Sequence, residues 1–455
     1  MSTTLGIINP ATEMEIATVA VHDLDETNRA IDAASLAAPS WGKVTPADRA
    51  RLLRRFADVI DSHIEELAQL EVANSGHTIS NARWEAGNVR DVMNYYSGAP
   101  ERHSGRQIPV AGGVDLTFYE PLGVVGIIVP WNFPMPIAGW GLGPALAAGN
   151  TVVLKPAMLT PLTAVRLGEL ALDAGIPEGV FQVVTGDGSM VGNRFVTHPA
   201  IRKVCFTGSN AVGRLIMQGC AEQVKRVTLE LGGKSPNIIF DDADLEKAAA
   251  SAPYAVFDNA GQDCCARSRI LVQASAYDRF MEYFETAVKG VKVLDPTSDD
   301  SEMGPLITAA QRESVRSYVD ESEVAFRGNA PEGPGYWMAP TVLEATDTKS
   351  RSFQEEIFGP VVSVVRFADE EEAVAIANES PYGLSGSIWS RDIGRALRVA
   401  RGVETGALSI NSNSSVRYST PFGGFKQSGL GRELGPDALL GFSEEKNVFI
   451  STEDN

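Results

Sequence analysis

The chain has 455 residues, of which 44% are hydrophobic and 21% are charged, and its formal net charge at pH 7 is −19. This composition is ordinary for a soluble protein of about two to four domains, whose core needs no metal or disulfide for stability. The negative charge argues against a nucleic-acid partner, because phosphate binding requires clustered Lys and Arg.

Neither CxxC nor Cys/His ligand spacing occurs around the four cysteines, so no metal site is predicted. The N-terminus has no basic segment and no long apolar stretch, and we therefore expect no signal peptide. The longest apolar run, around 124–129, is too short to span a bilayer. Free thiols without an export signal indicate a cytoplasmic protein with no membrane partner.

The stretch 24–74 is expected to be helical, with Asp25 or Thr27 capping the first helix. After Pro46, apolar residues recur at three- and four-residue intervals, which is typical of a helix with one buried face. The Asn-Ser-Gly sequence at 74–76 supplies a helix stop. These features predict core packing and no direct part in chemistry.

From about residue 122, short β-branched segments alternate with helical segments, which predicts βαβ units and parallel sheets. The expected strands are 124–129, 151–154, 180–184, 203–207, 236–240, 269–272, 361–367, 385–389 and 407–411. Two α/β domains are therefore expected, with a boundary near 232–234. The stretch 296–340, rich in Pro, Gly and acids, is expected to be a surface excursion. In such folds ligands bind beyond the carboxyl ends of the strands.

A cysteine pair, Cys264 and Cys265, follows a Gly-Gln turn and precedes an apolar strand-like run at 270–272. A reactive cysteine needs a defined turn and nearby dipoles or positive charge to lower its pKa, and this context can supply them. An adjacent cysteine pair in an arbitrary chain is more often a pair of buried structural thiols. The pair alone does not decide between these interpretations.

Other candidate residues also have ordinary structural explanations when each is considered alone. The segment 206–213, Phe-Thr-Gly-Ser-Asn-Ala-Val-Gly, is either a phosphate-binding helix start or a plain strand-to-helix turn. Glu230, an acid inside an apolar run, is either a buried general base or a solvent-facing strand residue. Asn132 is either an oxyanion donor or a turn residue. Lys155 and Glu356 would, in isolation, be surface residues.

Together these motifs resemble the NAD(P)-dependent aldehyde dehydrogenase superfamily over almost the whole chain. The motifs occur in the order typical of that superfamily, which makes the set far more specific than any one member. They are Pro-Trp-Asn-Phe-Pro at 130–134, Lys-Pro-Ala at 155–157, Phe-Thr-Gly-Ser at 206–209 with Gly213, Glu-Leu-Gly-Gly-Lys at 230–234, Gly-Gln-Asp-Cys at 261–264, Glu-Ile-Phe-Gly-Pro at 356–360 and Pro-Phe-Gly-Gly-Phe-Lys-Gln-Ser-Gly at 421–429.

The resemblance implies a role for each matching position. Cys264 would be the nucleophile with Cys265 as a bystander, Asn132 and the Cys264 backbone N–H the oxyanion hole, and Glu230 the general base. The implied cofactor, NAD with NADP as an alternative, would be held by Trp131, Lys155, Gly208, Ser209, Gly213, Leu231, Glu356 and Phe358. The implied substrate tunnel is lined by Phe133, Trp140, Asp263 and Phe422, and in addition by Tyr96 and Val416.

The implied reaction is oxidation of an aldehyde to the acid through a thiohemiacetal and a thioester, which an activated water hydrolyses. Met158 departs from the Glu that many NAD-using relatives carry at this position, which predicts loose cofactor discrimination. Asp263 precedes the nucleophile at a position that varies in the superfamily. It would suit an aminoaldehyde if it faces the tunnel, and the alternative is local backbone bonding in the turn.

The implied architecture is α/β, with a Rossmann-like cofactor domain, an α/β catalytic domain and a small β arm for oligomerisation. The expected segments are 1–104 and 122–232 for the cofactor domain, 233–425 for the catalytic domain, and 105–121 with 426–455 for the arm. We expect a homodimer or homotetramer that acts on a small-molecule aldehyde. The alternatives are a coenzyme A-acylating dehydrogenase and a non-catalytic protein that kept the fold.

Overall fold

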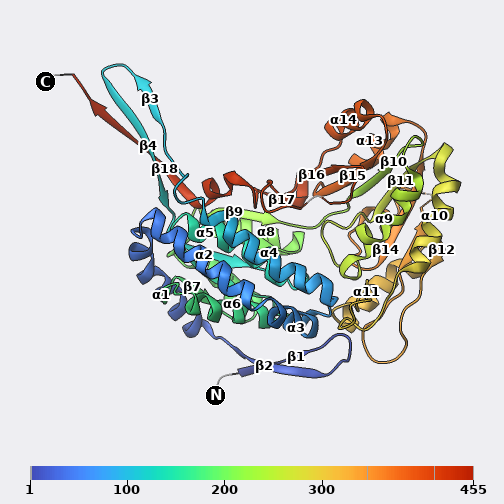
Figure 1. The fold of residues 1–455 in the computed structure, drawn as a ribbon, viewed down its shortest axis with the longest axis horizontal. Coiled ribbons are helices and arrows are strands. Elements are labelled where there is room, and N and C mark those ends of the chain that lie inside the picture. Colours follow the sequence, from blue (N-terminus) through green and yellow to red (C-terminus); the bar gives the residue numbers. More distant parts are fainter. Residues whose placement is uncertain (1–2, 346, 415, 454–455) are drawn as a thin grey trace.

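Two open, mostly parallel sheets lie on opposite sides of the molecule, and a narrow β arm projects from one of them (Figure 1). The structure is a computed structural model that describes residues 3–345, 347–414 and 416–453. The outermost residues of the predicted terminal segments, 1–2 and 454–455, lie outside this description. None of the helices in the described ranges is long and apolar enough to cross a membrane.

The first sheet has six strands, and all of them except β17 run parallel. Its strands β5 and β6 are buried on both faces and consist largely of β-branched residues, as expected for a parallel sheet covered by helices. In spatial order the strands are β17 (Gly429–Leu430), β9 (Arg226–Glu230), β8 (Ile201–Thr207), β5 (Val124–Ile128), β6 (Thr151–Lys155) and β7 (Phe181–Val183).

The second sheet has seven strands, and only the edge strand β12 runs antiparallel to its neighbour. In spatial order they are β12 (Val324–Arg327), β13 (Thr341–Glu344), β14 (Val361–Phe367), β11 (Arg269–Gln273), β10 (Pro236–Ile239), β15 (Ser385–Trp389) and β16 (Ala407–Ile410). After β16 the chain returns to the first sheet, where β17 pairs with β9 beside Glu230.

Helices cover both sheets (Figure 1). Those before β10 are α1 (Leu24–Gly42), α2 (Pro46–Ser62), α3 (Ile64–Ser75), α4 (Ile79–Ser97), α5 (Pro134–Ala147), α6 (Leu162–Asp173), α7 (Asn193–Thr197) and α8 (Asn210–Ala221). Those after it are α9 (Leu245–Phe257), α10 (Tyr277–Gly290), α11 (Ala309–Asp320), α12 (Arg351–Gln354), α13 (Glu370–Asn378) and α14 (Ile393–Gly402). Short turns of other helix types are η1 (Gly188–Gly192), η2 (Asp258–Gly261), η3 (Ala274–Ala276), η4 (Lys426–Ser428) and η5 (Pro436–Phe442).

Helix α5 is buried along its whole length, between α4 and the first sheet. It is apolar on every side, which is the composition expected of a helix with no solvent face. The loop that enters α5 is consequently anchored at both of its ends, by β5 and by α5. This loop carries Asn132 and Phe133.

Two small β elements lie outside the main sheets (Figure 1). Strands β1 (Thr3–Ile8) and β2 (Glu15–Val21) form an N-terminal hairpin. Strands β3 (Gln107–Val110), β4 (Gly113–Pro121) and β18 (Ser443–Ser451) form the projecting arm, in which β18 pairs with the full length of β4.

The α/β prediction is confirmed, and most predicted strands match observed strands to within one or two residues. The predicted cap of α1 was wrong, because Asp23 caps this helix through a reciprocal capping box with Glu26. The stretch 296–340 is more than a surface excursion, since it contains α11 and β12. The expected stop at the end of α3 is present, with Gly76 in the left-handed region at φ 78°.

Candidate active site

The carboxyl ends of three neighbouring strands in the first sheet supply one wall of the site. Asn132 follows β5, Thr207 ends β8 and leads into α8, and Glu230 ends β9. Strands β5, β8 and β9 are adjacent and parallel, so these three ends meet at one edge of the sheet.

The turn before β11 supplies the opposite wall and carries Cys264. Three consecutive residues in η2 adopt the left-handed region, with φ of 49° at Asn259, 54° at Ala260 and 71° at Gly261. A turn at 264–265 follows, in which the Ala266 N–H donates to the Asp263 backbone oxygen at 3.0 Å, and Cys264 is half-buried in this turn. The turn predicted at Gly261-Gln262, before Cys264, is therefore present. It begins at Asn259, two residues before Gly261.

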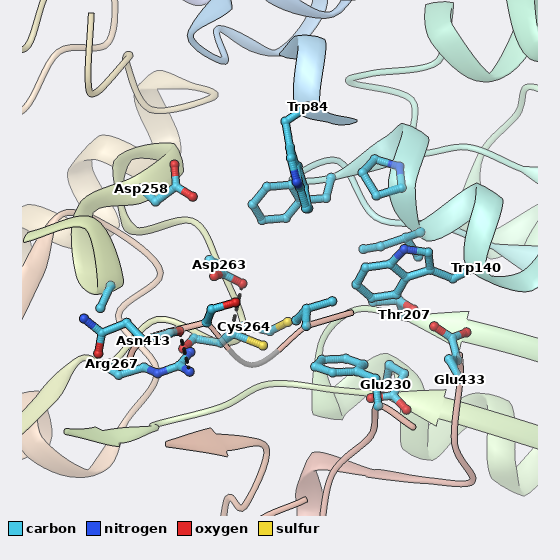
Figure 2. Close-up of a pocket in the computed structure, with 18 of the residues that line it drawn as sticks. Trp84, Trp140, Thr207, Glu230, Asp258, Asp263, Cys264, Arg267, Asn413 and Glu433 are labelled. Carbon is cyan, nitrogen blue, oxygen red and sulfur yellow. Dashed lines mark hydrogen bonds between the residues drawn. The ribbon is translucent and has the colours of Figure 1, made fainter. Parts of the chain in front are cut away.

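Two hollows meet at the cysteine. Both are open to solvent, with volumes of about 960 Å³ and about 700 Å³, and the residues that line both of them are Thr207, Glu230 and Cys264. Figure 2 shows Cys264 in the middle of the larger hollow, with Trp84 on one side and Glu230 with Glu433 on the other. Asn132 lines the smaller hollow. The three predicted catalytic residues are thus brought together from segments up to 132 positions apart.

Glu230 is buried, and neither carboxylate oxygen has a hydrogen-bond partner within the described ranges. Burial raises its pKa well above 4.5, and the neighbouring carboxyl of Glu433 raises it further. Burial also raises the pKa of Glu433 to about 7. The prediction left open a solvent-facing Glu230, and the observed burial removes that alternative. A carboxyl with a raised pKa and free oxygens is suited to accept a proton during a reaction.

The surroundings of Cys264 favour the thiol over the thiolate. A hydrogen bond with the Cys265 side chain, together with burial, raises the pKa of Cys264 well above 9. The carboxyl groups of Asp263 and Glu356 add to this effect. Cys264 needs a base to remove its proton, because the thiolate is the nucleophile and the surrounding groups do not stabilise it.

The Asn132 amide is held in one orientation. Its Nδ2 donates to the backbone oxygen of Gln262 at 2.9 Å, and the residue is only 4% exposed. A carbonyl oxygen only accepts hydrogen bonds, so it selects the amide nitrogen over the amide oxygen. One N–H of Asn132 is used in this way, and the other can still serve an oxygen bound at Cys264.

The residues predicted to bind a cofactor lie around the smaller hollow, with two exceptions. Six of them line it: Trp131, Gly208, Ser209, Leu231, Glu356 and Phe358. Trp131 and Phe358 meet edge to face, with ring centroids 5.3 Å apart. Glu356 accepts a hydrogen bond from the Gly233 N–H at 2.9 Å, and burial raises its pKa to about 7. It was expected to be a surface acid when considered alone, whereas it lies half-buried at the hollow.

The two exceptions are Gly213 and Lys155. Gly213 lies in the first turns of α8, where an added Cβ would come within 2.6 Å of the Leu231 side chain. Its contribution is therefore close packing of the helix against the end of β9. Lys155, at the end of β6, is buried; its Nζ donates to the Pro156 oxygen at 2.9 Å, and burial lowers its pKa to about 8.

The predicted tunnel residues Phe133, Trp140, Asp263, Phe422 and Val416 all line the larger hollow. Tyr96 does not line it, because this side chain is buried in the core, where its hydroxyl donates to the Gly435 oxygen at 2.8 Å. Asp263 combines both of its predicted behaviours. Its Oδ1 accepts the Cys265 N–H at 2.8 Å, and the side chain also lines the hollow.

Several lining residues were not assigned to the site from the sequence. Trp84 comes from α4, Asp258 and Arg267 flank the cysteine, and Glu433 comes from the segment after β17. Asp258 and Arg267 lie within the cysteine motif and were within reach of the sequence analysis. Trp84 and Glu433 carry no local signal, because only the tertiary fold brings their segments to Cys264.

Comparison with known proteins agrees with this geometry. The model of the aldehyde dehydrogenase family matches residues 1–448. The chain belongs to the aldehyde dehydrogenase family. An aldehyde dehydrogenase of Emericella nidulans is 40% identical, with 98% of this chain and 91% of that protein covered. A betaine aldehyde dehydrogenase of Bacillus subtilis is 38% identical, with 98% and 94% covered.

Solved structures of aldehyde dehydrogenases share the fold. A betaine aldehyde dehydrogenase from Staphylococcus aureus, solved in complex with NAD+, superposes with a TM-score of 0.96 at 39% identity. That alignment covers 100% of this chain and 92% of the other. The present chain is therefore an enzyme that oxidises aldehydes. The predicted resemblance to aldehyde dehydrogenases is confirmed over nearly the whole length of the chain.

Proposed function

We propose that the chain oxidises an aldehyde to the carboxylic acid with reduction of NAD(P), by covalent catalysis on Cys264. The observation that carries this proposal is the junction of two hollows at Cys264 and Glu230. One hollow takes the aldehyde, and the other takes the nicotinamide end of the cofactor. A thiol and a base at the junction can reach a carbon bound between them.

The residues of the smaller hollow fit a dinucleotide. The start of α8 presents backbone N–H groups beside Gly208 and Ser209, which suits a pyrophosphate. An added Cβ on Gly232 would come within 2.3 Å of Glu356 Oε2, so the absent side chain leaves this carboxylate room to line the hollow. Glu356 would bind a ribose hydroxyl, and Trp131 and Phe358 would flank the nicotinamide. When bound, the nicotinamide supplies the acceptor for the hydride.

The first chemical step is addition of the Cys264 sulfur to the aldehyde carbon. The thiol proton must leave before or during attack, and Glu230 supplies the carboxylate that accepts it. The aldehyde oxygen then carries negative charge in a thiohemiacetal. The free N–H of Asn132 and the backbone N–H of Cys264 donate to it, and burial strengthens both bonds because water is excluded.

The second half of the reaction releases the acid from a thioester. Once hydride has left the substrate carbon, the acyl group remains bonded to Cys264 Sγ. Glu230 first loses to solvent the proton that it took from the thiol. A water molecule then attacks the acyl carbon while Glu230 takes one of its protons, and Glu230 passes that proton to the sulfur, which leaves as the thiol. Burial and Glu433 support this role, since they raise the pKa of Glu230 and so make its carboxylate a stronger base.

We propose an aldehyde that carries a positive charge, such as an aminoaldehyde. The larger hollow has four carboxyl side chains (Asp258, Asp263, Glu230 and Glu433) and one basic side chain, Arg267, among its lining residues. Aromatic rings stand among them, and a cation binds favourably to such faces. The betaine aldehyde dehydrogenases among the relatives support this substrate class by their names.

Asp263→Asn tests the substrate class. We expect kcat/KM for an aminoaldehyde to fall relative to that for an alkyl aldehyde of equal length by about tenfold, the equivalent of about 1.4 kcal/mol. Asparagine keeps the acceptor oxygen that bonds the Cys265 N–H, so the turn remains intact. Steady-state kinetics with both aldehydes measure the ratio, and an unchanged ratio would contradict an electrostatic role for Asp263.

Met158 bears on cofactor choice. A carboxylate there would bond the adenosine ribose and repel a 2′-phosphate, and like charges placed together cost several kcal/mol. With Met158 we expect kcat/KM for NAD and NADP to agree within about tenfold. Met158→Glu should widen the gap in favour of NAD, and a large NAD preference in the wild-type chain would contradict the expectation.

We also propose that the arm joins copies of this chain into a homodimer or homotetramer. The arm projects from the body (Figure 1). Apolar side chains are exposed on all three of its strands, among them Ile108, Phe118 and Phe449. Strand β18 has β4 on one side only, so its other edge can pair with a strand of a second copy. In this division, 1–104 with 122–232 binds the cofactor, 233–425 carries the nucleophile, and 105–121 with 426–455 assembles.

The decisive experiment is NADH or NADPH formation at 340 nm across a panel of aminoaldehydes, alkyl aldehydes and aryl aldehydes. Turnover with at least one class supports the proposal and selects the substrate. If no aldehyde is oxidised, coenzyme A is added next, since a thiol acceptor would reveal an acylating dehydrogenase. If no cofactor is reduced under either condition, the result would favour a non-catalytic protein that kept the fold.

A further inference from the structure

A closed ring of hydrogen bonds joins the two loops that build the site. Nδ2 of Asn259 donates to the Asn132 backbone oxygen at 2.8 Å and to the Gln262 backbone oxygen at 3.3 Å. Nδ2 of Asn132 donates to the same Gln262 oxygen at 2.9 Å. The exposed fractions of Asn132, Asn259 and Gln262 are 4%, 6% and 1%, so water does not compete for these bonds.

This ring lies where the oxyanion donors are set. Asn132 comes from the loop between β5 and α5, and Gln262 precedes Cys264 by two residues. The distance between the Asn132 amide and the Cys264 backbone N–H therefore depends on how these two loops are joined. Asn259 contributes both of its N–H groups to that joint, one to each loop.

The backbone of Asn259 is anchored independently of its amide. Its N–H donates to Asp258 Oδ1 at 3.0 Å, and the Asn81 side chain on α4 donates to the same carboxylate. Ala260 adopts the same left-handed region without any polar side chain. The turn therefore does not need an amide in order to form, and the Asn259 side chain is left with the two loops as its partners.

We propose that Asn259 is a positioning residue, whose amide holds the Asn132 backbone and the Gln262 carbonyl at the separation that aims the Asn132 amide at the oxyanion. The inference rests on the function proposed above. It predicts that loss of the Asn259 amide lowers the rate of the step in which the aldehyde oxygen becomes negatively charged. Reactions of the Cys264 thiol that form no oxyanion should be nearly insensitive to it.

The test is Asn259→Gly, because glycine accepts a positive φ and removes only the amide. We expect kcat for aldehyde oxidation to fall by about 10- to 100-fold, which is less than loss of an oxyanion donor itself. Alkylation of Cys264 by iodoacetamide, followed by mass spectrometry, should keep its rate within about twofold, since this substitution builds no oxyanion. Ala260→Gly is the matched control for a loosened turn, and it should retain the wild-type kcat.

A double-mutant cycle shows whether Asn259 acts through Asn132. In an Asn132→Ala background, Asn259→Gly should lower kcat by less than about threefold, because the group it positions is gone. Two results would overturn the inference: a kcat for Asn259→Gly equal to that of the wild type, or an equally large loss in both backgrounds. If Asn259→Gly does not fold, Asn259→Asp decides. The aspartate side chain has the same size as asparagine, but it places a carboxylate oxygen next to the backbone oxygens of Asn132 and Gln262, where the amide nitrogen donated. An unchanged kcat in this variant would again overturn the inference.

These outcomes are separable from failure of the proposed function. A wild-type chain that oxidises no aldehyde would remove the function and the inference together. An active wild type with an equally active Asn259→Gly variant would remove the inference alone.

Discussion

Replacing Cys264 with alanine should abolish aldehyde oxidation, with a loss in kcat of at least about 10⁴-fold. The sulfur is the only protein atom of the proposed mechanism that bonds to the substrate carbon. Cys265 also lines the larger hollow but is more buried than Cys264, and its backbone N–H donates to Asp263. The measurement is NADH formation at 340 nm with saturating aldehyde and cofactor.

Cys265→Ala is the matched control, and it should keep a kcat near that of the wild type. It also removes the side-chain hydrogen bond that raises the pKa of Cys264. Alkylation of Cys264 should therefore begin at a lower pH in this variant than in the wild type, which a pH series with iodoacetamide measures. An inactive Cys265→Ala and an active Cys264→Ala would mean that the neighbouring thiol is the nucleophile.

Replacing Glu230 with glutamine should lower steady-state kcat by about 10²- to 10⁴-fold, because both the Cys264 thiol and the attacking water lose their base. Glutamine has the same shape but cannot accept a proton. Rapid mixing should show slow NADH formation from the first turnover, without a burst. A burst of about one NADH per site, with a thioester in the mass spectrum of the quenched protein, would show that Glu230 activates only the water.

Glu433→Gln is the companion variant for pH. Glu433 raises the pKa of Glu230, so its removal should lower that pKa. In the wild type, kcat/KM should increase with pH as Glu230 loses its proton, because only the carboxylate accepts one. In Glu433→Gln this increase should occur at a lower pH. A profile that does not move would show that Glu230 is not the group that titrates.

Two alternatives to the proposed function have different signatures. A coenzyme A-acylating enzyme resolves its thioester with a thiol, and its base would have no water to activate. Here neither carboxylate oxygen of Glu230 has a hydrogen-bond partner among the residues that the structure describes, and Glu230 lies at the junction of the two hollows, as a water-activating base requires. A non-catalytic protein would have no use for a thiol, an oriented amide and a buried carboxyl that converge on one point.

Local sequence patterns were sufficient for most of the secondary structure. Strands β14 and β15 match their predicted bounds completely, and β14 is the nearly continuous apolar segment expected of a buried parallel strand. The N-terminal hairpin and α11 were missed, because their residues are partly exposed and give weak periodicity. The predicted cap of α1, Asp25 or Thr27, lies two or four residues after the observed cap Asp23, because several polar residues in this segment are plausible caps and backbone geometry chooses among them.

The sequence by itself determined the family, the order of the motifs and the identity of Cys264, Asn132 and Glu230 as candidates, because each occupies a short motif whose residues are contiguous. Only the tertiary structure decided which distant side chains join them. Glu433 reaches Glu230 because the chain crosses back after β16 and pairs with β9, and Trp84 reaches the cavity from α4. Asn259 acquired its partners in the same way, through a hydrogen bond to a residue 127 positions away. Such contacts depend on how separate elements pack, and the free energy of packing is not encoded in any local window of sequence.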